Sequence, residues 1–538
     1  MTQPVSTPGD SFRRWDIRVL DPATAIRQPA QAAPEVTAYR GNVLLITATD
    51  QAVADAVIAA VDEIIAQLGV RRSGPAPFDV DGESRERDGR NLEHERRARL
   101  LRAAAQNGIP LVFPYFLEPA AEGPTQPVDA WTVLQAIRSR GDEVLDRAVG
   151  LDHLMVSAAI TGNPFVAGNP FVAGNPFVAG NPFVAGNPFV AGNPFVAGNP
   201  FVAGNGATGT YGVAGLGGHG PVSVVLPAPR PRKVGRRPGV VVMDTGVGGH
   251  PWFSAPNEKV QRQLWLADGT VLGTDVSKQT AIDTDPESAG AVVDPMTGTL
   301  GSHAGHGTFI AGLLRQTCPE AQITVLRIMG ADGVVAEDVL TTELTALALH
   351  QRQNPGRTDA LVLSLGYYAE TAADQDYTAG LHVLLADLAA VGVTTFAAAG
   401  NDATDRRSYP AAFAVQPPFG TVGACGVVSV AAVNPDGTVA MFSNDGSWVT
   451  AQAPGANVVS TAPITTQGGL AAAGSVLDER DRVRSTIDPD NYAGGFATWS
   501  GTSFAAPVLA GRFLAALTDL AGKDDAANRA AIVQTLQR

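Results

Sequence analysis

The sequence has very little cysteine and no long apolar run. Its 538 residues include two cysteines, Cys318 and Cys425, too few to crosslink a chain of this length into a disulfide framework. No run of about 18 apolar residues occurs, and the first residues contain no apolar stretch of signal-peptide length. The sequence therefore predicts no transmembrane segment. We expect a cytoplasmic protein, with a non-standard export route left open.

Charge is missing from the middle of the chain. There is no Asp, Glu, Lys or Arg between His153 and Pro229, whereas residues 230–237 (RPRKVGRR) contain five basic residues. From residue 238 onward 30 acidic residues outnumber 16 basic ones, and the net charge of the whole chain is −14. Nucleic-acid binding requires basic faces that neutralise phosphates, so this balance argues against a nucleic-acid-binding protein.

These changes in composition predict three parts: an N-terminal domain over 1–150, a linker over 151–237 and a C-terminal domain over 238–538. The linker contains the hexapeptide NPFVAG seven times in tandem, from Asn163 to Gly204. Proline in every unit and the turn-forming pairs Asn-Pro and Gly-Asn favour a flexible, low-complexity linker over a β-solenoid. The exact identity of the units leaves a second interpretation open, a processed peptide or a partner-docking segment.

The N-terminal part has the pattern of a small α/β or α+β domain. An apolar strand at Asn42–Ala48 is followed by an amphipathic helix at Gln51–Leu68, with Asp50 as its N-cap. Further along we expect an Arg-rich helix, a short strand and another helix, at Asn91–Gln106, Ile109–Phe116 and Val128–Arg138. No cluster of nucleophiles or metal ligands marks a site in this part.

The C-terminal part alternates apolar strands with helical stretches, which is typical of an α/β domain with a mostly parallel sheet between two helical layers. In such sheets chemistry is expected at the carboxyl ends of the strands. The predicted strands are Val240–Met243, Ile323–Ile328, Ala360–Ser364, Thr394–Ala398 and Val427–Ala432, and helices are predicted at Thr308–Gln316 and Val339–Gln351.

Four short motifs lie along this part. Asp244 follows a strand in Asp-Thr-Gly, and His306 lies in Gly-His-Gly-Thr at the start of a helix. Asn401 follows another strand, and Ser503 lies in Gly-Thr-Ser-Phe-Ala-Ala-Pro at a helix N-terminus. Each residue alone has an ordinary structural explanation as a loop, turn or cap residue. Their spacings of 62, 95 and 102 residues fit within one domain.

In this order the motifs resemble those of the subtilisin family of serine peptidases, the subtilases, which also have the order Asp, His, Ser. The resemblance implies a serine endopeptidase that hydrolyses peptide bonds through an acyl-enzyme intermediate. Ser503 would be the nucleophile, His306 its general base and Asp244 the residue that orients the imidazole. Asn401 and the Ser503 N–H would form the oxyanion hole. The implied partner is a protein or peptide substrate, and no cofactor is implied.

Two further segments resemble the family's substrate-binding strands. Ser364-Leu365-Gly366 looks like the segment that pairs with an extended peptide, and Gly330–Val335, which includes Gly333, looks like the facing edge. Subtilases often carry an N-terminal propeptide. The first 150 residues are compatible with such an intramolecular inhibitor, with an accessory domain as the alternative.

Two segments depart from the family pattern. The insert between Asp244 and His306 is long and acidic, and we expect a solvated loop there, with a lid or a calcium loop left open; its acidic residues are Asp283, Asp285, Glu287 and Asp294. No metal ligand is assigned. The basic segment Arg230–Arg237 is expected to be a polar linker that contacts the acidic domain, and processing at this junction is left open.

Overall fold

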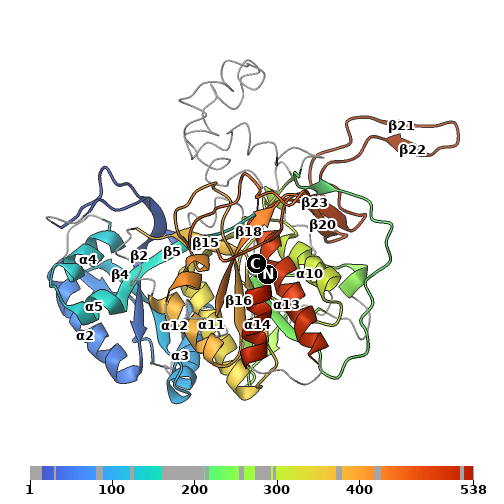
Figure 1. Cartoon of the computed structure of the whole chain (residues 1–538). Coiled ribbons are helices and arrows are strands. Elements are labelled where there is room, and N and C mark those ends of the chain that lie inside the picture. Colours follow the sequence, from blue (N-terminus) through green and yellow to red (C-terminus); the bar gives the residue numbers. More distant parts are fainter. Residues whose placement is uncertain are drawn as a thin grey trace.

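The computed structural model describes most of the chain (Figure 1). The described residues are 15–28, 32–79, 89–120, 127–159, 211, 217–253, 260–272, 287, 292–294, 298–370, 379–416, 426–520 and 526–536. The NPFVAG repeats and Cys425 lie outside them, so the linker prediction is not addressed by the structure. Cys318 is buried and free.

A six-stranded parallel sheet forms the centre of the C-terminal part, as the sequence predicts. Its strands lie in the order β12-β7-β14-β16-β18-β19. Their bounds are Gln322–Arg327 for β12, Gly239–Asp244 for β7, Ala360–Leu363 for β14, Thr394–Ala398 for β16, Val427–Val433 for β18 and Ala451–Pro454 for β19. The carboxyl ends of these strands therefore meet at one edge.

Helices cover both faces of this sheet. Successive residues of a strand point to opposite sides, and since the residues of these strands are apolar on both sides, both faces are buried under helices. Val240 and Val242 of β7 pack in one cluster with α10 (His306–Thr317) and α13 (Thr502–Asp519). Val241 and Met243 pack in another with α11 (Glu337–Gln353) and α12 (Ala379–Ala390). The three-layer α/β prediction is thus confirmed, with α14 (Ala526–Leu536) next to α13.

The N-terminal part forms a sheet and helices at one side of the molecule, in blue and cyan in Figure 1. Asp50 caps α2 through the amide of Val53, as predicted. The strands are β1 (Ile17–Leu20), β2 (Thr37–Ala48), β3 (Val70–Arg72), β4 (Leu111–Pro119) and β5 (Val149–Ser157), and the helices are α2 (Gln51–Ala66), α3 (Gly89–Gln106), α4 (Ala130–Arg138) and α5 (Glu143–Ala148). We call residues 17–148 the N-terminal unit.

Strand β5 joins the two parts. Its first half pairs with β2, whereas its second half pairs with β13 (Val334–Ala336) and β15 (Leu365–Tyr368) of the C-terminal part. One antiparallel sheet of eight strands therefore crosses from one part to the other. The predicted boundary between residues 150 and 151 lies inside β5.

Two arginines of the basic segment contact acidic residues of the C-terminal part: Arg232 pairs with Glu320 at 2.7 Å and Arg236 with Asp359 at 2.9 Å.

The remaining strands are short. They are β6 (Gly220–Pro221), β8 (Leu264–Trp265), β9 (Val271–Leu272), β10 (Val292–Asp294), β11 (Thr299–Leu300), β17 (Ser408–Tyr409), β20 (Val458–Thr461), β21 (Ser475–Leu477), β22 (Val483–Ser485) and β23 (Phe496–Trp499).

None of the helices in the described ranges combines the length and apolar character needed to cross a membrane. Within the same ranges, His, Cys, Asp and Glu side chains form no group of three or more suited to a metal ion.

Candidate active site

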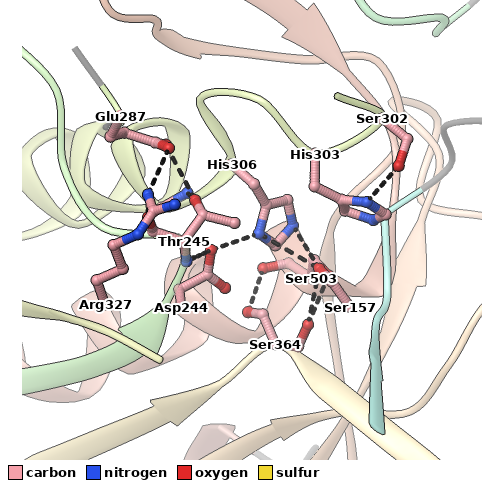
Figure 2. A network of polar contacts seen from close by, with 11 residues as sticks. Ser157, Asp244, Thr245, Glu287, Ser302, His303, His306, Arg327, Ser364 and Ser503 are labelled. Carbon is pink, nitrogen blue, oxygen red and sulfur yellow. Dashed lines mark hydrogen bonds and ion pairs between the residues drawn. The ribbon is translucent and has the colours of Figure 1, made fainter. Parts of the chain in front are cut away.

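The four motif residues come together at the carboxyl edge of the central sheet. Asp244 is the last residue of β7, His306 the first of α10 and Ser503 the second of α13. Asn401 follows β16 by three residues. Figure 2 shows His306 between Asp244 and a group of three serines, Ser157, Ser364 and Ser503.

Asp244 and His306 are both fully buried and joined by a hydrogen bond of 2.8 Å between Oδ1 and Nδ1. The same carboxylate oxygen accepts the backbone N–H of Thr245 at 2.7 Å. Because Nδ1 donates to the carboxylate, the other ring nitrogen, Nε2, is left as an acceptor. This is the tautomer that a general base requires.

A second group of contacts holds the loop that carries Asp244. Thr245 Oγ1 donates to Glu287 at 2.9 Å and accepts the N–H of Gly307 at 2.9 Å. Arg327 donates to the Thr245 carbonyl at 2.6 Å and lies 3.7 Å from the Glu287 carboxylate. Glu287 is buried, so the prediction of a solvated position was wrong for this residue: its carboxylate is held by a threonine hydroxyl and a guanidinium. The side chains of Asp283, Asp285 and Asp294 lie outside the described residues.

The Ser503 hydroxyl donates to the carbonyl of Ser364 at 3.1 Å, and the Ser364 hydroxyl donates to the carbonyl of Ser503 at 2.8 Å. The place next to the ring of His306 is taken by the hydroxyl of Ser157, which lies 3.2 Å from Nε2. Ser157 is the last residue of β5. A residue from outside the four motifs thus contacts the buried imidazole.

The end of β5 lies as an extended peptide between β13 and β15. We call the space between these two strands the cleft. The Ser157 N–H donates to the carbonyl of Gly333 at 2.8 Å, and the Ala158 N–H donates to that of Ser364 at 3.0 Å. Leu365 and Gly366 lie opposite Ser157 and Val156 in the antiparallel pair β15–β5. All four residues predicted for substrate binding therefore border this strand.

The carbonyl oxygen of Ala158 receives two N–H donors. It accepts the amide of Asn401 at 2.5 Å and the backbone N–H of Ser503 at 3.1 Å. The Asn401 side-chain oxygen accepts the N–H and the hydroxyl of Thr502, at 2.9 and 3.0 Å, which turns its NH₂ toward Ala158. A Cβ at Gly501 would lie 2.6 Å from the Ala158 oxygen, so this approach requires glycine. Two preorganised donors on one carbonyl are suited to stabilise an oxyanion.

The surroundings of His306 disfavour additional positive charge. Burial lowers the pKa of His219 to about 3, with a further lowering from the nearby His306. Burial and His306 also hold the pKa of His303 well below its ordinary value. The His219 ring stacks on Trp499 at 3.7 Å between ring centres. Neutral, apolar groups therefore shield the base from water, and shielding strengthens its hydrogen bond to Asp244.

Sequence reasoning missed Ser157 and Ala158. The linker was predicted to begin at residue 151, yet the strand sequence VGLDHLMVS continues to Ser157. The available signal was that apolar strand followed by small residues, Ser157-Ala158-Ala159, which an extended binding cleft accommodates readily.

Comparison with known proteins shows that the C-terminal part is similar to the subtilases. The model of the subtilase family matches residues 235–538. "Subtilisin-like protease 1" of Arthroderma gypseum is 28% identical over 226 residues, covering 41% of this chain and 37% of that protein. "Intracellular serine protease" of Paenibacillus polymyxa is 27% identical over 221 residues, or 38% and 52% of the two chains. "Subtilisin BL" of Lederbergia lenta is 26% identical over 246 residues, or 42% and 82%. The match thus spans about half or less of the first two relatives.

Proposed function

Because this chain belongs to the subtilase family, we propose that it is a serine endopeptidase and that its own Ala158–Ala159 bond is one of its substrates. The observation that carries the proposal is the Ala158 carbonyl, which accepts hydrogen bonds from both Asn401 and the Ser503 N–H. A peptide carbonyl in that position is polarised for attack by the serine of the same site.

In the proposed reaction the Ser503 oxygen attacks the Ala158 carbonyl carbon while His306 Nε2 takes the hydroxyl proton. Asp244, hydrogen-bonded to Nδ1, stabilises the imidazolium that forms. The proton then passes to the nitrogen of Ala159, the peptide bond breaks and Ala158 remains as an ester on Ser503. Water, deprotonated by His306, hydrolyses the ester and releases the Ala158 carboxylate.

Replacing Asn401 by alanine removes one of the two donors to the Ala158 carbonyl. We expect turnover on peptides to fall by about 10²–10³, the value measured for the corresponding loss in subtilisin itself, with little change in KM. Steady-state kinetics of the processed enzyme measure both constants. Asn434→Ala serves as a control, because Asn434 is a half-buried turn residue that bonds Tyr211 and Thr438 rather than any of the four motif residues. An Asn401→Ala enzyme with wild-type turnover would contradict an oxyanion role for this amide.

Ser157 delays the reaction in this proposal. The Ser503 hydroxyl must turn from the Ser364 carbonyl toward His306 Nε2, where the Ser157 hydroxyl lies at 3.2 Å. In Ser157→Ala this competitor is gone, and we expect self-cleavage to be faster by up to about tenfold, the equivalent of one hydrogen bond. Quenched samples taken during refolding, separated by gel electrophoresis, give the rate. Slower cleavage than in the wild type would show that the hydroxyl assists the base.

The N-terminal unit would act as an inhibitor that holds β5 in the cleft. Asp152 of β5 is buried, and its carboxylate accepts the N–H of Asp338 at 2.9 Å in the first turn of α11. This helix begins after Ala336, which has no capping side chain, so Asp152 supplies the cap. Arg40 bridges Asp152 and Asp338 at 2.9 and 3.2 Å. Arg96 of α3 pairs with Glu343 at 3.1 Å. The interface is thus dense in charge pairs.

The proposed function is tested on the purified full-length chain. Mass spectrometry is expected to find one fragment ending at Ala158 and one starting at Ala159, and a fluorophosphonate is expected to label the second fragment at neutral pH. No labelling, together with an intact chain, would defeat the endopeptidase proposal. A cut that falls only inside residues 163–204 would instead favour the interpretation of the repeats as a processed peptide.

A further inference from the structure

His153 is the sixth residue on the N-terminal side of the Ala158–Ala159 bond, and its imidazole is buried between two carboxylates. Nδ1 lies 2.8 Å from Glu337 Oε2, and Nε2 lies 2.9 Å from Glu370 Oε2. The ring of Tyr367 stacks on the imidazole, with 4.3 Å between the ring centres and 20° between the planes. Two acids and an aromatic face thus enclose one cationic side chain.

All three enclosing residues belong to the C-terminal part and continue the peptide-binding cleft. Glu337 is the first residue of α11 and directly follows β13. Tyr367 lies in β15, and Glu370 follows that strand by two residues. Since β13 and β15 are the strands that flank the peptide, any peptide bound in the same register brings its sixth side chain to this enclosure.

The charges of the enclosure favour a cation. Burial alone would lower the pKa of His153, but Glu370 and Glu337 more than offset it and raise this pKa to about 10. Burial would raise the pKa of Glu370, but His153 above all lowers it below the ordinary range. The second oxygen of Glu370, Oε1, is buried without a hydrogen-bond partner among the described residues. It offers an acceptor to a side chain with more N–H groups than histidine, such as lysine or arginine.

We infer that Glu337, Tyr367 and Glu370 form a substrate subsite for a positively charged side chain six residues before the cleaved bond. This inference rests on the proposed endopeptidase function and deepens it. The substrates it selects are extended peptides with His, Lys or Arg at that position, and His153 occupies the subsite until the chain is cut.

The alternative is that His153 only holds the N-terminal unit in place. Asp152 and His153 differ in the parts of the protein that they contact. Asp152 is shared with Arg40 of the N-terminal unit, whereas both ion pairs and the ring contact of His153 are made with the C-terminal part. After the cut the enclosure remains part of the enzyme, and its two carboxylates are available to bind the cationic side chain of another peptide.

Peptide hydrolysis tests the inference in trans. The enzyme is prepared by letting the full-length chain process itself and then removing its N-terminal fragment. Fluorogenic peptides carry the sequence of residues 152–162 with His, Lys, Gln or Glu at the position of His153, and a shorter peptide begins at Leu154. We expect KM to be at least about tenfold higher for the Glu peptide than for the Lys peptide, with similar kcat. In the double variant Glu337→Gln, Glu370→Gln this ratio is expected to fall close to one. Glu343→Gln, the same change two turns further along α11, keeps the ratio.

The pH profile provides a readout that a purely structural role would not change. The groups facing the cation are the Glu337 and Glu370 carboxylates and the Tyr367 ring. Glu370 also interacts with Arg406 of the C-terminal part and, before the cut, with Arg138 of the N-terminal unit, and Glu337 interacts with Asp152 of β5. A free histidine has a pKa of about 6.5. The His peptide therefore binds most tightly below that pH, and its affinity is lost as the pH rises toward the pKa of the bound histidine. KM for the His peptide relative to the Lys peptide is therefore expected to rise at least about tenfold between pH 7 and 9.

The same preference is measured without catalysis in the uncut Ser503→Ala chain. Hydrogen exchange of the amides at 154–158 reports whether β5 occupies the cleft. We expect His153→Lys to retain the protection and His153→Glu to lose most of it. Equal protection in the two variants, or equal KM for the Lys and Glu peptides, would overturn the subsite. If none of the peptides is cut, the short one included, the endopeptidase proposal fails, and the exchange data alone decide the charge preference.

Discussion

Replacing Ser503 by alanine is expected to leave the chain uncut and to lower peptidase turnover on the order of 10⁶-fold, the cost of deleting this nucleophile in subtilisin itself. The Ser503 hydroxyl is the group proposed to bond to the Ala158 carbonyl carbon, and the backbone N–H of the same residue donates to that carbonyl's oxygen. Intact-mass spectrometry and peptide hydrolysis measure the two effects.

The alanine variant is expected to fold normally, because the Ser503 hydroxyl donates to the Ser364 carbonyl, and that carbonyl keeps the Ala158 N–H as a donor when the hydroxyl is removed. Its thermal unfolding should match that of the wild-type precursor. Ser485→Ala, in the exposed hairpin strand β22, is the matched control and should cut itself normally. A folded Ser503→Ala chain that still separates at Ala158–Ala159 would refute self-cleavage by this serine.

Replacing Asp244 by asparagine is expected to lower turnover by about 10⁴, the effect known for this exchange in another serine protease. The buried carboxylate accepts the imidazole Nδ1–H at 2.8 Å and the Thr245 N–H at 2.7 Å. One oxygen, Oδ1, accepts both N–H groups, so an amide oxygen in its place can keep both hydrogen bonds. The amide carries no negative charge, however, and no longer stabilises the imidazolium that forms when His306 takes the Ser503 proton.

Single-turnover kinetics on a fluorogenic peptide measure this loss for the chemical step alone. Asp436→Asn is the matched control, because Asp436 lies in an exposed turn and bonds only the nearby Thr438. Since attack assisted by hydroxide does not require a protonated His306, we expect the Asp244→Asn enzyme to regain part of its rate at high pH. A loss of less than tenfold at neutral pH would contradict the proposed role of the Asp244 carboxylate.

The parts of the fold that depend on local sequence were predictable. Strand β16 has the predicted bounds, and Asp50 caps α2 as expected, because both follow from residues close together in the chain. The sequence also singled out the four motif residues, because Asp244, His306 and Ser503 lie in short motifs that resemble those of the family and Asn401 follows a predicted strand.

Contacts between distant segments were not predictable in this way. Pairing of β5 with β13 and β15 joins residue 156 to residues 334 and 366, and no periodicity encodes such a register. The burial of Glu287 under Thr245 and Arg327 depends on a loop whose path the composition does not specify. The enclosure of His153 requires three segments far apart in sequence, so an isolated histidine within a strand gave no signal.

Strand β5 is covalently continuous with the enzyme on its C-terminal side only until the Ala158–Ala159 bond breaks. Before the cut, its local concentration at the cleft is fixed by the chain itself, on the order of millimolar or above for a linked segment, and is independent of the amount of protein. After the cut, occupancy becomes a bimolecular equilibrium, so dilution alone promotes release of the fragment. The time at which peptidase activity begins would then depend on how far the molecules are diluted after processing. A concentrated preparation would remain inactive longer than a dilute one.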